Sequence, residues 1–282
     1  PYLANVVMSG SVLESSSNEL AKQTISKIID GTTQVSVAFS EANNGYNFHD
    51  IETSVNDGKL NGVKTVVLNA SFANSFLVYA KNEDKLVIYL VDAKAAGVSV
   101  NSFSTVDGQN CGDVTFENVE VGESLIISHD NDASQAINAM LDLANLCICA
   151  EAVGGMTASY LKTVQYTKER EQFGKPISEH QAMRMKLSEM ATELEAARQL
   201  VYYAASMKDS GKRCDLEAGM AKIKSAKAGE YVTREAMQIL GGYGYSKEFP
   251  VERFWRDARV ISIFEGTSEI QHEVIAKSLL SK

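Results

Sequence analysis

One carboxylate near the C-terminus stands where it could act as a base. Glu265 follows Phe264 and precedes Gly-Thr-Ser268, where a new helix is expected to begin. A carboxylate at a helix start is commonly held in its charged form by the helix dipole. In an apolar, water-poor pocket the same group has a raised pKa and can remove a proton from carbon. Position alone favours the structural role, so the surrounding motifs must decide.

Two other stretches carry residue types that bind phosphate groups. Arg170 opens the sequence Arg-Glu-Gln-Phe-Gly-Lys-Pro176, and a guanidinium matches the geometry of phosphate oxygens. Gly241 and Gly242 follow an expected helix, and glycines let backbone N–H groups approach a ligand closely. Each stretch alone is weak, because a single arginine is usually solvated and a glycine pair is an ordinary helix stop.

The composition restricts the classes of partner. The chain has 282 residues, 45% of them hydrophobic, and a formal net charge of -9. This length allows two domains with cores of their own. The acidic balance leaves no broad basic surface for nucleic acid or anionic lipid. The cysteines show neither a C-x-x-C pair nor a metal-ligand spacing, which indicates reduced, buried thiols and no metal site; they are Cys111, Cys147, Cys149 and Cys214.

Targeting and membrane signals are weak. Asp142 and Asn145 interrupt the best apolar run, so no membrane span of about 18 residues is expected. No signal peptide opens the chain, which favours the cytoplasm, with the mitochondrial matrix as the alternative. The chain starts at Pro1 rather than Met, so we expect either a lost N-terminus or a partial chain.

The texture of the sequence changes twice. Residues 1–31 read as two short helices separated by a Ser-rich break, the remnant of a larger helical domain. Residues 32–129 hold short β-branched runs separated by turn pairs such as Asn-Gly and Asp-Gly, which predict a β-barrel or sandwich. Residues 130–282 switch to helical spacing and predict a four-helix bundle. The predicted fold class is therefore α+β.

Within the helical part, three expected helix starts carry capping residues. Ser178 with Gln181 and Ser268 with Gln271 read as capping boxes, and Asp215 reads as a third cap. Apolar residues at alternating spacings of four and three predict one antiparallel packing seam, made of Met183, Leu187, Met190, Leu194, Ala197, Val201 and Ala204. We expect Met185 to be core as well. The stretch 250–257 is expected to be a loop.

The three motifs together resemble the acyl-CoA dehydrogenase family. The resemblance covers about residues 30–282 in order, with Arg170–Pro176, His180-Gln181, Gln238–Gly244 and Phe264–Thr267 as its marks. It implies a middle β-domain, a C-terminal four-helix bundle, FAD as cofactor, and oxidation of an acyl-CoA thioester to 2-enoyl-CoA. It also implies an electron-transfer flavoprotein as electron acceptor and an FAD site shared between subunits of an oligomer.

Site residues follow from the same resemblance, position by position. Glu265 matches the base that removes the α-proton, while flavin N5 accepts the hydride. Substrate contacts are implied for Asp142, Phe264 and Gly266. Cofactor contacts are implied for Arg170, Gln172 and Phe173, for Gln238, Gly241 and Gly242, for Thr267 and Glu269, and for Phe39 and Ser40 in the middle domain.

The middle domain departs from the family at positions expected to touch the flavin ring. Val66-Val67-Leu68 stands where Trp-Ile-Thr is usual, and Leu68 has no hydroxyl to offer. Tyr46 lies in a loop that differs from the usual Thr-Glu-Pro, Gly-Ser and Asp, and Asn145 replaces an Arg. Three alternatives stay open: a divergent homo-oligomeric enzyme, a catalytic subunit of a heterotetramer of the steroid side-chain type, or a non-catalytic half-site partner that completes a neighbour's FAD site. A flavin monooxygenase on the same fold is a weaker alternative.

Overall fold

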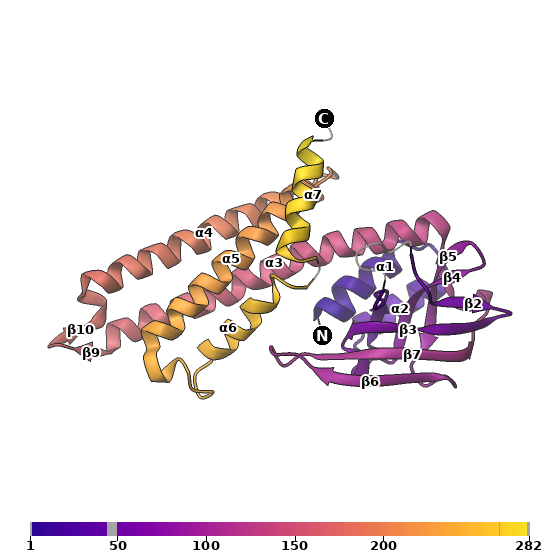
Figure 1. Cartoon of the computed structure of the whole chain (residues 1–282), viewed down its shortest axis with the longest axis horizontal. Helices are drawn as coiled ribbons and strands as arrows, with labels where there is room; N and C mark the ends of the chain where they lie inside the picture. The colour runs from indigo at the N-terminus through magenta and orange to yellow at the C-terminus, as the bar shows by residue number, and fades with distance from the viewer. Residues whose placement is uncertain (1, 44–49, 265, 281–282) are drawn as a thin grey trace. The chain divides into compact units, whose positions relative to one another are not determined.

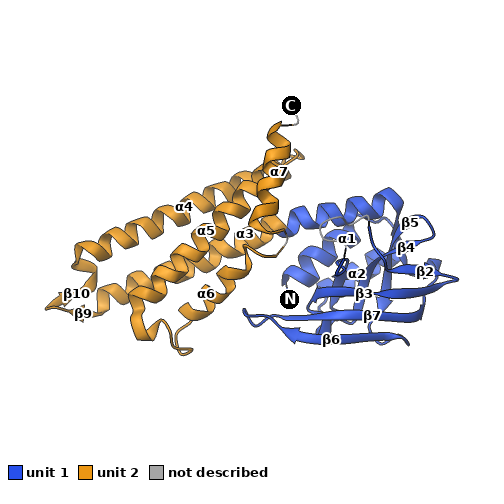
Figure 2. Ribbon diagram, viewed as in Figure 1, with its two compact units in different colours: residues 1–144 blue, residues 145–282 orange. Residues whose placement is uncertain are grey.

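Short runs of β-branched and aromatic residues within 35–129 form strands, and helical spacing on both sides produces helices (Figure 1). The computed structural model describes residues 2–43, 50–264 and 266–280. These fall into two compact units, residues 1–144 and 145–282 (Figure 2). The helix α3 (Asp130–Glu169) starts directly after the last strand of the sheet and continues into the second unit. The predicted division at 31/32 and 129/130 follows sequence texture and stays a prediction.

Unit 1 begins with helices that cover part of the sheet. A π-helix η1 (Tyr2–Ser9) runs into α1 (Gly10–Glu14), and α2 (Glu19–Ile29) follows the expected Ser-rich break. Asn18 caps α2, because its side-chain oxygen accepts a hydrogen bond from Ala21 N at 2.7 Å. Apolar residues of these helices share a core with strands β1, β4 and β5 and with the first half of α3.

Among the described residues, the sheet of unit 1 has eight strands in the order β6-β7-β3-β2-β4-β5-β8, with β1 pairing in parallel with β4. Six of these strands match predicted runs, whereas β2 and β8 were missed because they carry only one and two apolar residues, Val55 and the pair Ile126 and Ile127. The sheet-containing middle domain is confirmed. The bounds are β1 (Val35–Ala38), β2 (Ser54–Asn56), β3 (Lys59–Leu68), β4 (Ser75–Asn82), β5 (Lys85–Asp92), β6 (Val98–Ser104), β7 (Asn110–Glu120) and β8 (Ile126–His129).

Unit 2 is helical, as predicted. Besides α3 it contains α4 (Gln181–Asp209), α5 (Asp215–Leu240), α6 (Val251–Val260) and α7 (Ser268–Leu280), with the short strands β9 (Glu171–Gln172) and β10 (Lys175–Pro176) between α3 and α4. The expectation of a loop at 250–257 is wrong. Pro250 lies just before α6, where a missing N–H costs nothing, and so it starts the helix rather than preventing it.

The predicted packing seam of α4 is largely correct. Met190, Leu194, Ala197, Val201 and Ala204 are buried in one core with residues of α3 and α5. Polar pairs align α4 with α5 beside this core: Lys224 Nζ lies 2.6 Å from Glu193, and Tyr231 donates to Glu189 at 2.7 Å. The expectation that Met185 is core is wrong, because its side chain is 58% exposed.

The three predicted caps are wrong in detail. Ser178 lies in the 3-10 turn η4 (Ile177–Glu179), one turn before α4. Asp215 binds the Arg213 guanidinium at 2.6 and 3.0 Å instead of capping α5. At α7 the cap is Thr267 rather than Ser268, since Thr267 Oγ1 accepts from Ile270 N at 3.4 Å. For Asp215 the neighbouring guanidinium competes with the helix N-terminus for the side chain.

The long helix α3 meets a length and composition test for crossing a membrane. One 18-residue window reaches a mean hydropathy of 1.5, and 44% of that window is buried inside the protein. The expectation that charged and polar residues exclude such a window is therefore corrected. Core helices pass the same test, and α3 contributes buried residues to the cores of both units, so the window is weak support for a span.

Candidate cofactor and active site

The Arg-Glu-Gln-Phe-Gly-Lys-Pro motif folds as a tight hairpin. Gln172 of β9 pairs with Lys175 of β10, and the two residues between them, Phe173 and Gly174, have φ values of +56° and +80°. A two-residue turn with both φ values positive matches the twist of the flanking strands. The Phe173 side chain is 93% exposed, although a bulky residue rarely adopts this backbone region. The hairpin thus holds an aromatic ring at the surface at a conformational cost.

The glycine pair ends α5 as predicted and leaves room above the backbone. Gly241 has a φ of +60°, and its N–H donates to the carbonyl of Gln238. An added Cβ at Gly241 or Gly242 would meet no atom within 4 Å. A ligand can therefore approach the backbone at both residues.

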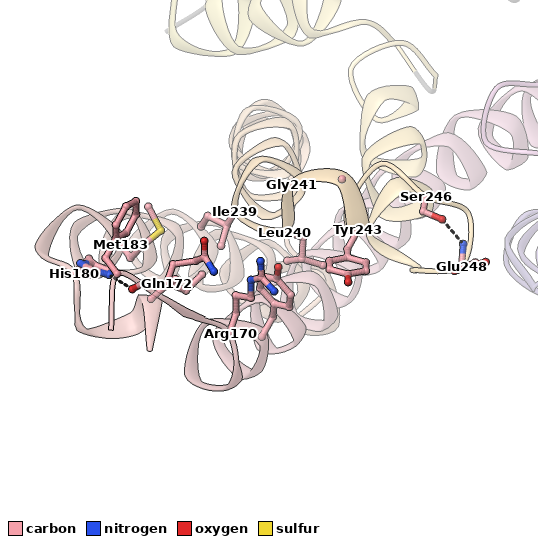
Figure 3. A pocket seen from close by; sticks show the side chains of 14 residues that line it. Arg170, Gln172, His180, Met183, Ile239, Leu240, Gly241, Tyr243, Ser246 and Glu248 are labelled. Atoms are coloured by element: carbon pink, nitrogen blue, oxygen red, sulfur yellow. Dashed lines mark hydrogen bonds between the residues drawn. The ribbon is translucent and has the colours of Figure 1, made fainter. Parts of the chain in front are cut away.

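The hairpin and the glycine pair line one pocket of about 790 Å³ in unit 2 (Figure 3). An edge contact between the rings of Tyr166 and Tyr243, 6.3 Å apart, joins the end of α3 to the turn after α5. Five predicted cofactor residues lie in this lining: Arg170, Gln172, Phe173, Gly241 and Gly242. Gln238 was also predicted, but it is exposed and not part of the lining.

Several lining residues were missed from the sequence. His180 was not among the predicted cofactor residues, but its Nε2 lies 3.2 Å from the carbonyl oxygen of Gln172, and its ring meets that of Phe173 edge-on at 6.1 Å. Ser246 Oγ accepts from the backbone N–H of Glu248 at 3.4 Å, and both residues line the pocket (Figure 3). His180 lies only eight residues after Gln172, and the hairpin between them turns the chain back toward Gln172. This short spacing was the signal in the sequence that could have placed His180 in the site.

The turn before α7 carries the predicted active-site residues. Glu265 lies outside the described residues, as does Tyr46. The carbonyl oxygens of Phe264 and Gly266 lie 2.6 and 3.4 Å from the Nζ of Lys222, a buried residue of α5. The sequence analysis had assigned Lys222 no role, because burial inside a helix bundle cannot be read from residue type alone.

Two predicted cofactor residues start α7. Thr267 forms the cap, and Glu269 is exposed. The backbone N–H of Glu269 itself and the hydroxyl of Thr267 lower the pKa of the Glu269 carboxyl. Neither residue belongs to the lining of the pocket beside Arg170. They therefore mark a separate part of unit 2.

In unit 1 the segment after β1 is tied to β3. Ser40 O accepts from Thr65 N at 2.9 Å, and Phe39 O lies 3.4 Å from Lys64 Nζ. Lys64 forms a buried ion pair with Glu41 at 2.7 Å, with side chains 0% and 5% exposed. The two predicted flavin contacts of this unit, Phe39 and Ser40, therefore lie beside the strand that carries Val66 and Leu68.

The ion pair changes the pKa of both partners. Burial opposes ionisation of Glu41, but Lys64 and the backbone N–H of Glu52 outweigh it and hold the pKa of Glu41 below 4.5. Burial lowers the pKa of Lys64 from 10.5 to about 8 against the opposing effect of Glu41. The pair is kept charged by short contacts in a place where each charge alone would be unfavourable.

Asp142, the third predicted substrate contact, is an exposed residue of α3 within unit 1. The four cysteines are free thiols; the prediction that they are buried holds for Cys111, Cys149 and Cys214, whereas Cys147 is only half-buried. Burial raises the pKa of Cys111 to about 11 and that of Cys149 to about 12. Within the described part of the chain, no cluster of three or more His, Cys, Asp or Glu side chains is arranged to hold a metal ion.

Comparison with known proteins gives one consistent result. The model of the acyl-CoA dehydrogenase C-terminal domain matches residues 134–280, and that of the middle domain matches residues 36–119. A 3-(aryl)acrylate reductase of Clostridium sporogenes is 35% identical over 93% of this chain and 73% of its own length. A caffeyl-CoA reductase-Etf complex subunit of Acetobacterium woodii is 33% identical over 99% of this chain and 76% of its own. The structure of butyryl-CoA dehydrogenase from Megasphaera elsdenii aligns with a TM-score of 0.91 and 30% identity, covering 99% of this chain and 76% of the other.

Proposed function

Because the chain belongs to the acyl-CoA dehydrogenase family, we propose that it exchanges two hydrogens between an acyl-CoA thioester and the corresponding 2-enoyl-CoA, with FAD as cofactor. The observation that carries the proposal is the pocket in unit 2. It joins a guanidinium and an exposed aromatic ring from the hairpin to two unobstructed glycines at the end of α5.

The pocket fits the adenosine diphosphate part of FAD. Arg170 supplies a permanent positive charge with several donors for pyrophosphate oxygens. Gly241 and Gly242 let the backbone approach the same oxygens, since nothing stands within 4 Å of their Cβ positions. The flat ring of Phe173 could stack on the adenine base. These residues would hold the nucleotide end, while Phe39, Ser40, Thr267 and Glu269 are proposed for the rest of the cofactor.

Glu265 is the proposed base. When bound, FAD supplies the hydride acceptor at N5. Glu265 takes the α-proton, and the neighbouring Phe264 side chain is proposed as the apolar wall beside it. Gly266 and Asp142 are proposed substrate contacts.

The direction of the reaction is a separate question. The Clostridium and Acetobacterium relatives are named reductases, whereas the Megasphaera structure is a dehydrogenase. One carboxyl group serves both directions, because protonated Glu265 can return a proton to the α-carbon of an enoyl thioester. An electron-transfer flavoprotein is the proposed redox partner in either direction.

Anaerobic titration of the FAD-loaded chain with saturated acyl-CoA thioesters of increasing length tests the proposal. Bleaching of the flavin absorbance is expected with at least one thioester. Glu265→Gln should abolish bleaching and leave FAD bound, whereas Glu273→Gln, an exposed carboxylate on α7, should behave as the wild type. Bleaching that survives Glu265→Gln would exclude Glu265 as the base.

A second candidate is a half-site subunit that completes a neighbour's FAD site without turnover of its own. Val66 and Leu68 favour it, because neither offers a hydroxyl and Leu68 packs against the core of unit 1. Phe173, 93% exposed, would contact a cofactor held mainly by another subunit. A paralogous chain of a steroid-type heterotetramer is the proposed partner. Stoichiometric FAD in the chain purified alone, together with substrate bleaching, would exclude this candidate.

A further inference from the structure

A lysine is completely buried at the turn that precedes α7. Lys222 lies within α5 and has no exposed surface. Its Nζ donates to the side-chain oxygen of Asn145 on α3 at 3.0 Å, to Phe264 O at 2.6 Å and to Gly266 O at 3.4 Å. An ammonium group has three hydrogens to donate, and burial of a cation is unfavourable unless they are used. These distances place three neutral oxygens around it.

The turn before α7 is also held in place by the close packing of Gln271. Gly266 has a φ of +89°, and a Cβ there would lie 2.8 Å from Gln271 Nε2. Gln271 is buried, and its Oε1 lies 3.3 Å from the position a Cβ would take at Gly219 of α5. Side chains larger than hydrogen at 219 and 266 would therefore displace Gln271. The turn is fixed to α5 by Lys222 directly and by Gln271 through close packing.

We propose that Lys222 is a positioning residue for the reaction and that Asn145 assists it. Its ammonium fixes the carbonyl groups of the two residues that flank position 265, and its role would be to hold the chain on both sides of the proposed base. The inference rests on the proposed function. A lysine that only filled space could be replaced by an apolar side chain of similar length. Aiming a base, in contrast, depends on directional hydrogen bonds, and a misplacement of about 1 Å lowers a rate by about 100-fold.

The test uses Lys222→Met in the full chain loaded with FAD. Lys224→Met is the matched control, because Lys224 is on the same helix and pairs with Glu193 instead of the turn. We expect FAD content and acyl-CoA affinity within about threefold of the wild type, and single-turnover flavin reduction slower by about 100-fold, in Lys222→Met. The control should reduce its flavin at close to the wild-type rate. A Lys222→Met rate within threefold of the wild type would overturn the proposal.

Two further measurements keep the test decisive. Asn145→Ala removes one acceptor without emptying the site and should slow reduction by about tenfold, the effect of one hydrogen bond, even if Lys222→Met fails to fold. Hydrogen exchange of the backbone amides at 266–268 should be at least about tenfold faster in Asn145→Ala and in Lys222→Met than in Lys224→Met. This measurement needs no turnover. A wild type that no acyl-CoA reduces would refute the proposed function alone, whereas unchanged exchange and an unchanged reduction rate would refute the role of Lys222.

Discussion

Breaking the buried ion pair of unit 1 should show how firmly the segment after β1 is held. Glu41 accepts from Lys64 Nζ at 2.7 Å, from Glu52 N at 2.6 Å and from Thr53 N at 3.0 Å. Removing one partner from a buried pair costs about 3–5 kcal/mol, because the other charge stays buried. Substitution of Glu41 and substitution of Lys64 should lower the free energy of unfolding by different amounts, since the partner that stays behind has different remaining contacts in the two cases.

Glu41→Gln should be the more destabilising change, at about 4–5 kcal/mol, and Lys64→Met should cost about 3 kcal/mol. After Lys64→Met the carboxylate keeps two backbone donors. After Glu41→Gln the buried ammonium faces only neutral oxygens, that of the new amide and the carbonyl of Phe39 at 3.4 Å, and the amide NH2 is left facing the backbone N–H of Glu52. The double variant should cost less than the sum, because no buried charge is left.

Urea unfolding followed by far-UV circular dichroism measures these differences. Lys85→Met is the matched control in the same unit, since Lys85 and Asp130 are 4.0 Å apart with side chains 66% and 50% exposed. It should change the free energy of unfolding by less than about 1 kcal/mol. A larger loss in Lys64→Met than in Glu41→Gln, or strict additivity in the double variant, would refute the reasoning.

The same pair predicts a dependence of stability on pH. Burial lowers the pKa of Lys64 from 10.5 to about 8, so the unfolded chain binds more protons than the folded one between these values. Stability from this group therefore rises with pH across that window, by about 3 kcal/mol. The lowered pKa of Glu41 acts at the other end, since its contribution is present above 4.5 and is lost as the pH falls. Comparison with Lys64→Met isolates the alkaline part, and a wild-type curve parallel to that of the variant would contradict it.

Three further predictions concern the pocket and the thiols. Arg170→Ala should weaken FAD binding by about 10- to 100-fold in equilibrium titration, whereas Arg213→Ala, far along the sequence at the start of α5, should leave it unchanged. Phe173→Asn should raise the free energy of unfolding by about 1 kcal/mol, because asparagine tolerates a φ of +56°, and weaken FAD binding through the lost ring. Cys111 and Cys149 should react at pH 8 about 100-fold and 1,000-fold more slowly than a thiol of pKa 9.0, measured with a disulfide reagent before and after denaturation.

The sequence predicted elements with long, regular spacing and missed those set by a few residues. Short β-branched and aromatic runs located six strands, and the glycine at 241 marked the end of α5 correctly. The strands β2 and β8 contain too few apolar residues to form such a run. Pro250 was read as part of a loop, although proline is favourable in the first turn of a helix. Capping side chains were misplaced because a short polar side chain can bind several nearby groups.

For the site, the motifs predicted the residues that meet at the pocket, but they did not predict how those residues are held. Arg170 and Gly241 are far apart in sequence, and the resemblance to a family brought them together. Lys222 gave no signal, because its role depends on burial and on carbonyl groups of a distant turn. His180 also gave no signal of its contact, because its partner is the backbone carbonyl of Gln172. Contacts to backbone atoms leave no trace in residue types.

Val66 and Leu68 replace the Trp and Thr that are usual in the family, but the backbone of β3 at these positions is still held by contacts of its neighbours. Val66 has a φ of +53°, rare for a β-branched residue, and the pairing of β3 with β7 breaks between Lys64 and Val67. Such strain persists only where neighbouring contacts fix the backbone. Val66 N donates to Asp113 Oδ1 at 3.1 Å, Thr65 N donates to Ser40 O, and Lys64 is anchored by its ion pair. None of these contacts needs the side chain at 66 or 68, so the backbone beside the proposed flavin ring keeps its shape. The missing hydroxyl should therefore weaken FAD binding rather than abolish it, and a measured FAD affinity that is weak but saturable would count for a working site despite the changes at 66 and 68.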